Sequence, residues 1–302
     1  MVIDGKKIAE EILSKLKKLP HPKKFLAAFL VGDDSASESF LKQKEKTAKG
    51  LNVDFRIYRF PEKITQDKLR DEILKIVSHK TCGGAIAQLP LPARINAQYV
   101  LNAIPREKDI DALGERALGA FYTGRNLALP PAVGVVEEII ERFQQSERHS
   151  NTVNAIRTDE KIEEIWMNSE RSDEFVGLDC LKVAVVGLGT LVGKPIASWL
   201  MGKAREVYLL DKGSDFGILK SADIIVCGVG VPELIKPDML KNDTLVIDFG
   251  YGVIDGKISG DFDSSELTTY NLKLINYTPT PGGTGPILVA KLFENFYKLV
   301  LS

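Results

Sequence analysis

Residues 181–195 read LKVAVVGLGTLVGKP, and this stretch decides the fold of the second half of the chain. The apolar run at 183–186 is typical of a strand that is buried on both faces of a parallel sheet. Gly187, Gly189 and Gly193 follow, and then an apolar helical pattern begins. This order predicts a phosphate-binding cradle, because glycine lets the backbone approach a pyrophosphate and the free N–H groups of a helix start attract anions.

Asp211 strengthens this interpretation. It closes the next apolar run, residues 207–210, at 24 positions beyond Gly187. An acidic residue at this place accepts hydrogen bonds from the ribose hydroxyls of NAD. Gly193 lies one position later than the third glycine of G-x-G-x-x-G, so an ordinary strand–helix turn with a chance aspartate is the alternative. We interpret the stretch as a dinucleotide site.

Length and composition exclude several classes of protein. The 302 residues suffice for two domains with separate cores, and 40 basic residues against 41 acidic ones give a net charge of −1. This balance predicts no nucleic-acid or anionic-membrane partner. No apolar segment approaches a membrane span or a signal peptide. Three scattered cysteines and three isolated histidines predict neither a disulfide framework nor a metal site. We therefore expect a soluble, cytoplasmic protein.

The first half of the chain alternates predicted helices and strands. Helices are expected from the Asp4 cap to Leu19, at 37–49, and from the Thr65 cap through Val77, and strands at 25–31, 53–60 and 84–88. Strands separated by helices of this length indicate right-handed βαβ units and a parallel sheet. The whole chain is therefore predicted to be α/β, with two domains. Small molecules bind beyond the carboxyl ends of such strands, and one of these ends is at Gln88.

Gln88 begins the segment Gln-Leu-Pro-Leu-Pro, in which Pro90 and Pro92 hold the chain extended. A polar residue between a buried strand and a rigid segment is well placed to contact a ligand, although a surface turn fits these residues equally well. Further on, Lys-Asp-Ile-Asp at 108–111 would direct Asp109 and Asp111 to one side if extended. A solvated pair of carboxylates is the simpler explanation.

Lys44 lies within the apolar face that we predict for the helix at 37–49, which is formed by Phe40, Ala48 and Leu51. A lysine on an inward face must extend its charge to solvent, pair with a carboxylate or reach a cavity. If desolvated, its pKa falls and it can exchange a proton near neutral pH. A lysine that extends to solvent at a domain edge remains the alternative.

The second half contains further strand patterns at 207–210, 224–228, 245–249 and 272–277. A helix beginning near Pro131 precedes a polar insertion at 144–179, which we expect to be a mobile surface segment with at most a short turn at 162–166. The Pro- and Gly-rich loop at 278–286 leads into a final helix at 287–301. Its backbone N–H groups are candidates for contact with cofactor or substrate.

Together these motifs resemble the methylenetetrahydrofolate dehydrogenase/cyclohydrolase family. The matching segments are Ala36-Ser37 with Lys44, residues 88–92, residues 108–111, Val192-Gly193-x-Pro195, Asp248-Phe-Gly250 and residues 279–286. They occur in the family's order and span most of the chain apart from the insertion. The segments at 88–92 and 279–286 are highly specific.

The resemblance implies a folate-binding catalytic domain formed by residues 1–133 and 280–302, a Rossmann domain at 134–279 and a homodimer. It implies oxidation of 5,10-methylenetetrahydrofolate with NAD or NADP, and hydrolysis of the product to 10-formyltetrahydrofolate. These reactions belong to one-carbon metabolism and supply purine biosynthesis. Asp211 favours NAD, because it would repel the 2′-phosphate of NADP.

The resemblance also assigns roles to residues. Lys44 would be the general acid/base of hydrolysis, assisted by Gln88, and Asp111 would hold the pterin ring. The implied folate-binding residues are Phe40, Lys44, Gln88, Asp111, Pro281, Gly282 and Gly283. The implied cofactor-binding residues are Gly187, Leu188, Gly189, Val192, Gly193, Asp211, Gly250, Tyr251 and Gly285.

The sequence departs from the family pattern at several positions. Phe40 replaces a tyrosine one turn before Lys44, and Ala112 replaces a glycine after Asp111. Leu188 and Gly189 replace a basic residue and a serine in the cofactor loop, and Pro130-Pro131-Ala132 replaces Cys-Thr-Pro. We therefore expect a working dehydrogenase with weak cyclohydrolase activity. A shikimate-type dehydrogenase and a non-catalytic nucleotide sensor remain the alternatives.

Overall fold

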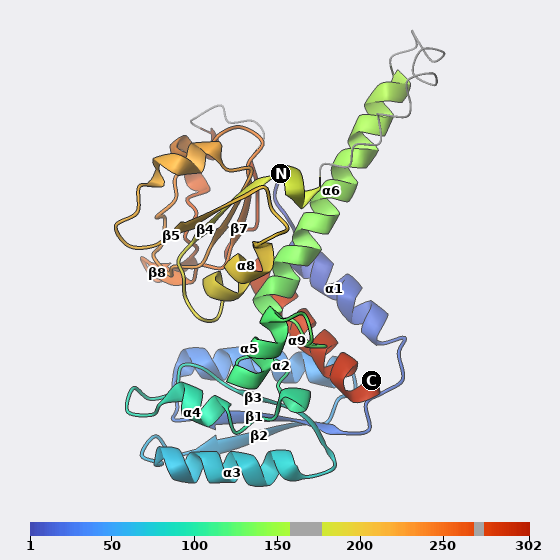
Figure 1. Ribbon diagram of the computed structural model, residues 1–302, viewed down its shortest axis with the longest axis vertical. Coiled ribbons are helices and arrows are strands. Elements are labelled where there is room, and N and C mark those ends of the chain that lie inside the picture. The colour runs from blue at the N-terminus through green and yellow to red at the C-terminus, as the bar shows by residue number, and fades with distance from the viewer. Residues whose placement is uncertain (158–176, 269–274) are drawn as a thin grey trace. The chain divides into compact units, whose positions relative to one another are not determined.

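The computed structural model describes residues 1–157, 177–268 and 275–302, and the chain divides into two compact units (Figure 1). We call Val2–Gly134 together with Thr278–Ser302 the split unit, and Met1 together with Val135–Tyr277 the central unit. Each unit contains a parallel sheet with helices, so the predicted α/β class is confirmed.

The split unit contains a three-stranded parallel sheet in the order β2 (Phe55–Phe60), β1 (Phe25–Val31) and β3 (Cys82–Ala87). The central strand β1 is buried along its whole length, which explains its unbroken apolar sequence. Its side chains alternate between two cores. Leu26, Ala28 and Leu30 enter one core, whereas Phe25, Ala27, Phe29 and Val31 enter the other.

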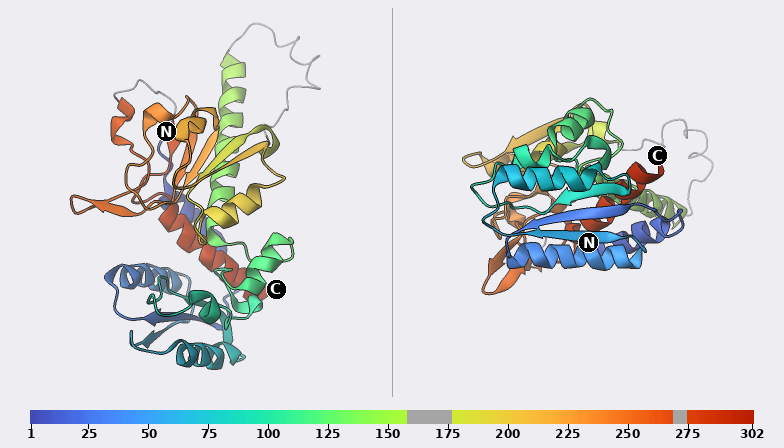
Figure 2. Two further views of the ribbon diagram at one scale, coloured as in Figure 1. Left: turned by 60° about the vertical axis from the view of Figure 1, so that its left-hand side comes forward. Right: turned by 90° about the horizontal axis from the view of Figure 1, so that it is seen from below.

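Helices cover both faces of this sheet. The first core receives side chains from α1 (Gly5–Leu16), α2 (Ser35–Gly50) and α9 (Thr284–Leu301), and the second from α3 (Gln66–Ser78) and α4 (Ala97–Leu101). The C-terminal helix α9 therefore packs in the same core as the first helices of the chain, and it lies against α1 (Figure 2). Arg106–Lys108 (η1) and α5 (Glu115–Tyr122) complete this unit.

The central unit contains five parallel strands in the order β10 (Asn276–Tyr277), β7 (Leu245–Asp248), β6 (Ile224–Cys227), β4 (Lys182–Val186) and β5 (Glu206–Leu210). Strand β4 pairs with β5 on one side and with β6 on the other. The chain passes from β4 to β5 on one side and then crosses to β6 on the other side of β4, so the strand order reverses at β4. The point beyond the carboxyl end of β4 is therefore a topological switch point, where α/β sheets bind ligands. Helix α8 (Gly193–Leu200) begins there.

Four short 3₁₀ segments lie in the described part of the central unit: Leu178–Cys180, Phe216–Ser221, Pro237–Met239 and Ser265–Thr268. An antiparallel hairpin is formed by β8 (Gly252–Ile254) and β9 (Lys257–Ser259). Asp255 and Gly256 connect its strands with φ angles of 50° and 76°. The Asp-Gly dipeptide is the sequence signal for such a turn, and it was missed in the sequence analysis.

The prediction for the insertion at 144–179 was wrong in its first part. Helix α6 spans Pro131–Arg157 and continues through the residues expected to be mobile. No proline or glycine occurs between Gly134 and Gly177, and Glu, Arg and Gln favour the helix. Arg142 also forms an i,i+4 ion pair with Glu138 at 2.7 Å. The expected turn at 162–166 lies outside the described residues. Of the strand expected at 272–277, residues 272–274 also lie outside them, and its end forms β10 (Asn276–Tyr277).

None of the helices in the described ranges combines the length and apolarity that a bilayer span requires.

Candidate active site

Lys44 lies on the buried face of α2. Its neighbours on this face are Ser37, Leu41 and Ala48, at spacings that keep one helix side turned inward. The prediction that Phe40 belongs to this face was wrong, because Phe40 is 38% exposed whereas Lys44 is only 9% exposed. Leu41 takes the inward place because the stripe 37, 41, 44 and 48 has a regular spacing of four, three and four residues. The lysine is thus a core residue of this helix.

Gln88 is the partner of Lys44. Lys44 Nζ donates a hydrogen bond to Gln88 Oε1 at 2.9 Å, and both side chains are buried. The Gln88 amide also donates from Nε2 to the carbonyl of Leu89 at 2.9 Å. These two bonds give the amide one orientation, with its oxygen toward the lysine. The backbone N–H of Gln88 donates to Phe29, which places the residue at the carboxyl end of β3.

Burial changes the proton affinity of Lys44 and of Asp111. Desolvation lowers the pKa of Lys44, and the charge of Asp111 opposes this change. Desolvation raises the pKa of Asp111, and the charge of Lys44 opposes that change. Burial therefore brings the two pKa values closer together, so a proton is more easily exchanged at this site than on exposed groups.

Asp109 and Asp111 have different surroundings. Asp109 is 2% exposed, and its Oδ2 accepts a hydrogen bond from the backbone N–H of Gly114 at 2.8 Å. Burial raises the pKa of Asp109 from 3.8 to about 7. Asp109 thus fastens the loop that carries Asp111. Ala112 follows with φ of 52°, in the left-handed region where glycine is free of strain.

Asn295 of α9 holds the same loop from the other end of the chain. Its Nδ2 donates to the carbonyls of Ile110 at 2.8 Å and Leu129 at 2.7 Å, and its side chain is buried. Sequence analysis missed this residue. A polar residue inside the apolar pattern of a C-terminal helix was the available signal.

The loop with Pro281, Gly282 and Gly283 packs against the first turn of α1. A Cβ added at Gly5 would lie 1.8 Å from the carbonyl oxygen of Gly283, so the two backbones are in close contact. Gly282 has φ of 103°, which side chains rarely adopt. Gly5 is a further position that the sequence analysis did not single out. Gly285 lies in the first turn of α9, in the split unit rather than the central unit.

In the central unit, the glycines after β4 form a tight backbone cradle. Gly187 has φ of 90°, and a Cβ added at Gly193 would lie 1.8 Å from the carbonyl oxygen of Gly187. Gly189 has no heavy atom within 4 Å of such a Cβ, and Leu188 is half-buried. Val192 is the residue before α8 and provides no side-chain cap. The N–H of Lys194 donates to the carbonyl of Gly189 at 3.0 Å and Pro195 has no N–H, so Gly193 is the residue of this first turn whose N–H can meet an anion.

Asp211 lies at the same edge of the sheet as this cradle. The N–H of Gly187 donates to the carbonyl of Leu210 at 2.8 Å, so the residues after β4 and β5 are neighbours. Oδ1 of Asp211 accepts from the backbone N–H of Lys212 at 2.9 Å, and the side chain is exposed. The cradle and the exposed carboxylate have the arrangement expected for pyrophosphate and ribose.

Gly250 and Tyr251 follow β7 at this edge. A Cβ at Gly250 would lie 2.3 Å from the carboxyl carbon of Asp261, and its N–H donates to Asp248 Oδ1 at 2.6 Å. Tyr251 is exposed. Gly250 is therefore required by packing within the unit, whereas Tyr251 presents its ring to the outside.

Comparison with known proteins shows that two models of one family match this chain. The catalytic-domain model of tetrahydrofolate dehydrogenase/cyclohydrolase matches residues 3–111, and the NAD(P)-binding-domain model of the same family matches residues 172–302. The chain belongs to the tetrahydrofolate dehydrogenase/cyclohydrolase family. The resemblance inferred from the motifs is confirmed.

Individual members of the tetrahydrofolate dehydrogenase/cyclohydrolase family align along nearly the whole chain. The bifunctional protein FolD of Halothermothrix orenii is 32% identical, with 98% of this chain and 96% of the relative covered. The bifunctional protein FolD of Mycoplasmopsis synoviae is also 32% identical, with 99% of each covered. The crystal structure of the bifunctional FolD enzyme, a methylenetetrahydrofolate dehydrogenase/cyclohydrolase, from Campylobacter jejuni is 26% identical. It covers 100% of this chain and 98% of its own, with a TM-score of 0.83.

Proposed function

We propose that this chain oxidises 5,10-methylenetetrahydrofolate to 5,10-methenyltetrahydrofolate with a nicotinamide cofactor, and hydrolyses the product slowly to 10-formyltetrahydrofolate. Family membership and the bifunctional relatives support both activities. The observation that carries the proposal is the buried pair of Lys44 and Gln88, because a desolvated lysine with a fixed amide partner can exchange protons near neutral pH. Neither the shikimate-type reading nor the nucleotide sensor is better supported.

In this proposal Lys44 is the general acid/base of the hydrolytic step. It accepts a proton from the attacking water and returns one to the ring nitrogen that leaves, while Gln88 keeps its Nζ in place. Asp111 accepts hydrogen bonds from the amino-pyrimidine edge of the pterin. Burial raises the pKa of Asp111, and the charge of Lys44 opposes this change. Phe40, Pro281, Gly282 and Gly283 complete the proposed folate site.

The cofactor is proposed to bind to the central unit, and its nicotinamide supplies the acceptor for the hydride of the methylene carbon. Gly187, Leu188, Gly189, Val192 and Gly193 would surround the pyrophosphate, and Asp211 the ribose. Gly250, Tyr251 and Gly285 are the further proposed contacts. Oxidation requires alignment of the two reacting carbons rather than a proton donor, so it depends less on Lys44 than hydrolysis does.

We extend the proposal to assembly and cellular role on the family resemblance alone. The chain would act as a homodimer in the cytoplasm and supply one-carbon units for purine biosynthesis. Residues 1–133 and 280–302 would bind folate, and residues 134–279 the dinucleotide. Light scattering on the purified protein measures the assembly, and a monomeric mass under assay conditions would contradict the dimer.

The test is an absorbance assay with methylenetetrahydrofolate and either cofactor, followed by a separate assay of methenyltetrahydrofolate hydrolysis. Lys44→Met should lower hydrolysis by ~10²–10⁴, the range typical of general acid/base groups. Lys46→Met is the matched control, because Lys46 is an exposed lysine of the same helix. Absence of cofactor reduction with the parent protein would favour the non-catalytic alternative, and equal effects of the two substitutions would remove Lys44 from its proposed role.

A further inference from the structure

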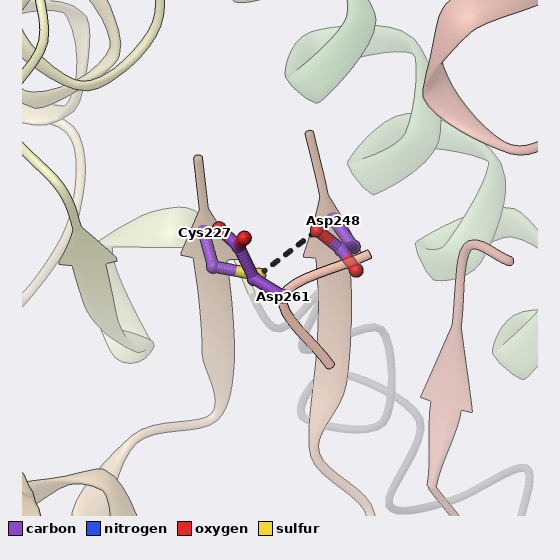
Figure 3. A group of neighbouring side chains, drawn as sticks. All are labelled: Cys227, Asp248 and Asp261. Carbon is purple, nitrogen blue, oxygen red and sulfur yellow. Dashed lines mark hydrogen bonds between the residues drawn. The ribbon is translucent and has the colours of Figure 1, made fainter. Parts of the chain in front are cut away.

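Three fully buried side chains meet at the carboxyl ends of β6 and β7 in the central unit (Figure 3). Cys227 ends β6, Asp248 ends β7, and these residues are direct neighbours in the parallel sheet. Asp261 reaches the same place from the segment after β9. One thiol sulfur and one carboxylate oxygen of each aspartate lie within 4.8 Å of one another. This group includes none of the residues proposed to bind folate or cofactor.

Asp261 has an oxygen that nothing in the described structure satisfies. Its Oδ2 accepts hydrogen bonds from the backbone N–H groups of Val229 at 2.6 Å and Gly230 at 3.3 Å. Its Oδ1 has no hydrogen-bond partner, although the residue is 0% exposed. An unpaired buried carboxylate oxygen is costly, so such an atom in a native protein indicates a ligand, a water molecule or an ion.

Asp248 is held in place by backbone groups on both of its oxygens. Oδ1 accepts from the N–H of Gly250 at 2.6 Å, and Oδ2 accepts from the N–H of Phe262 at 3.0 Å. The Cys227 thiol donates to Asp248 Oδ1 at 3.4 Å. Backbone hydrogen bonds of this kind orient metal ligands in proteins, because they fix a carboxylate before an ion arrives.

The spacing of the Cys227 and Asp248 ligand atoms suits a tetrahedral ion. Zinc binds thiolate sulfur at about 2.3 Å and carboxylate oxygen at about 2.0 Å, which places sulfur and oxygen about 3.5 Å apart in a tetrahedron. The Cys227 Sγ to Asp248 Oδ1 distance is 3.4 Å. Asp261 supplies the third ligand from within 4.8 Å, and its unpaired Oδ1 requires no existing bond to be broken.

We propose that Cys227, Asp248 and Asp261 bind one Zn²⁺ ion. Sulfur in the ligand set favours zinc over magnesium and calcium, which prefer oxygen ligands only. On binding, the thiol loses its proton to solvent and its sulfur forms a bond to the metal, while Asp248 Oδ1 exchanges the thiol hydrogen bond for the metal. Water supplies the fourth ligand. The two carboxylates and the thiolate carry three negative charges, so together with Zn²⁺ the site has a net charge of −1.

The ion would be structural. It would join the ends of two neighbouring strands to the segment at Asp261, which in turn holds the backbone N–H groups of Val229 and Gly230. The loop after β6 would thereby become more rigid. Binding to the folded state alone predicts that zinc raises the melting temperature of the whole chain.

The test measures zinc in the full-length protein, expressed in zinc-supplemented medium, kept reduced and passed over a desalting column. About one zinc per chain is expected, as for a site with three fixed ligands. Cys227→Val removes the sulfur but keeps a buried side chain of similar size, and should abolish the zinc. Cys82→Val is the matched control, because Cys82 is also a fully buried thiol but lies on β3 in the split unit, outside the group.

A second measurement distinguishes loss of the zinc site from misfolding of a variant. Each variant is checked by circular dichroism, and the parent protein and both variants are loaded with Co²⁺, which gives a thiolate charge-transfer band only when sulfur is a ligand. The band should be absent in Cys227→Val and retained in Cys82→Val. A zinc-free parent, a folded Cys227→Val protein with the same zinc content, or a melting temperature unaffected by zinc would each overturn the proposal. The folate assay is independent of these outcomes.

Discussion

In the split unit the candidate functional groups are side chains, whereas in the central unit they are backbone groups and one exposed carboxylate. Lys44 and Asp111 owe their altered pKa values to burial. The cradle around Gly187 and Gly193 contributes backbone and space, and these two residues are glycines because a Cβ at either position would meet backbone atoms. A reaction that transfers protons needs tuned side chains, whereas a pyrophosphate needs shape and aligned dipoles.

This difference predicts how each site fails. Substitution of a functional side chain by one of similar size removes its chemistry but leaves the fold intact. Substitution of a glycine by alanine in a site built from backbone adds a methyl group, and this group displaces the neighbouring backbone. Four expected outcomes follow from this contrast between the two sites.

The largest effect is expected for Gly193→Ala. The new Cβ would lie 1.8 Å from the carbonyl oxygen of Gly187 and 3.0 Å from the Cα of Leu188, so backbone has to move. We expect a loss of more than about 4 kcal/mol of stability, as for other severe backbone changes, and loss of cofactor binding. Denaturant unfolding and fluorescence titration with NADH measure the two quantities.

Gly189→Ala is the control for this prediction. Its Cβ would have no heavy atom within 4 Å, so the protein should fold as well as the parent. Weaker cofactor binding by this stable variant would place the pyrophosphate at the loop. Unchanged stability of Gly193→Ala would show that the cradle has a different shape from the one described.

The second effect is a dependence of stability on pH that originates at Asp109. Its pKa is raised from 3.8 to about 7, so the folded protein binds this proton more tightly than the unfolded chain does. The resulting stabilisation is complete below about pH 4 and is lost as the pH rises through about 7. At 1.36 kcal/mol per pKa unit the loss is about 4 kcal/mol.

Asp109→Asn should remove this part of the pH dependence, since the amide cannot ionise but can still accept from Gly114. The measurement is the free energy of unfolding at several pH values between 4 and 8, expressed as the difference between variant and parent, because Asp248 also has a pKa raised to about 6. Asp33→Asn, at an exposed position of the same unit, is the control. A constant difference across this range would contradict the assignment.

The third effect concerns cofactor choice. Asp211 should favour NAD over NADP by roughly ten- to hundredfold in kcat/KM, because its charge repels a 2′-phosphate and Leu188 offers no positive charge in return. Asp211→Ser should narrow this ratio, mainly by improving NADP. Lys212 would reduce this preference, because its positive charge is next to Asp211 and attracts the 2′-phosphate of NADP. A preference of the parent for NADP would show that Lys212 dominates.

The smallest effect is expected for Phe40→Tyr, which adds one hydroxyl one turn before Lys44. A hydrogen bond to a charged group would change the proton affinity of the lysine, so hydrolysis should rise by roughly three- to tenfold while oxidation changes less. The gain should disappear in the Lys44→Met background, which isolates the coupling between the two positions. Equal gains in both activities would mean that the hydroxyl acts on folate rather than on Lys44.

The sequence by itself determined the local elements and the glycine cradle after β4. The β4 strand, its glycine turn and α8 are contiguous, so periodicity and glycine geometry specify them without distant contacts. The Asp4 cap of α1 is equally local, because its carboxylate accepts from the N–H groups of Lys6 and Lys7. Motif order then identified the family. The continuation of α6 to Arg157 was also a local property, and here composition was given too much weight over helix propensity.

Only the tertiary structure decided which side chains meet. Lys44 and Gln88 are 44 residues apart, and Asn295 reaches Ile110 across 185 residues, so no local pattern reports either contact. Packing also determines that Leu41 rather than Phe40 lies on the inward face of α2. Leu41 is buried in one core with residues of β1, whereas Phe40 is exposed. Local propensity specifies elements, but desolvation and paired hydrogen bonds arise when distant segments pack.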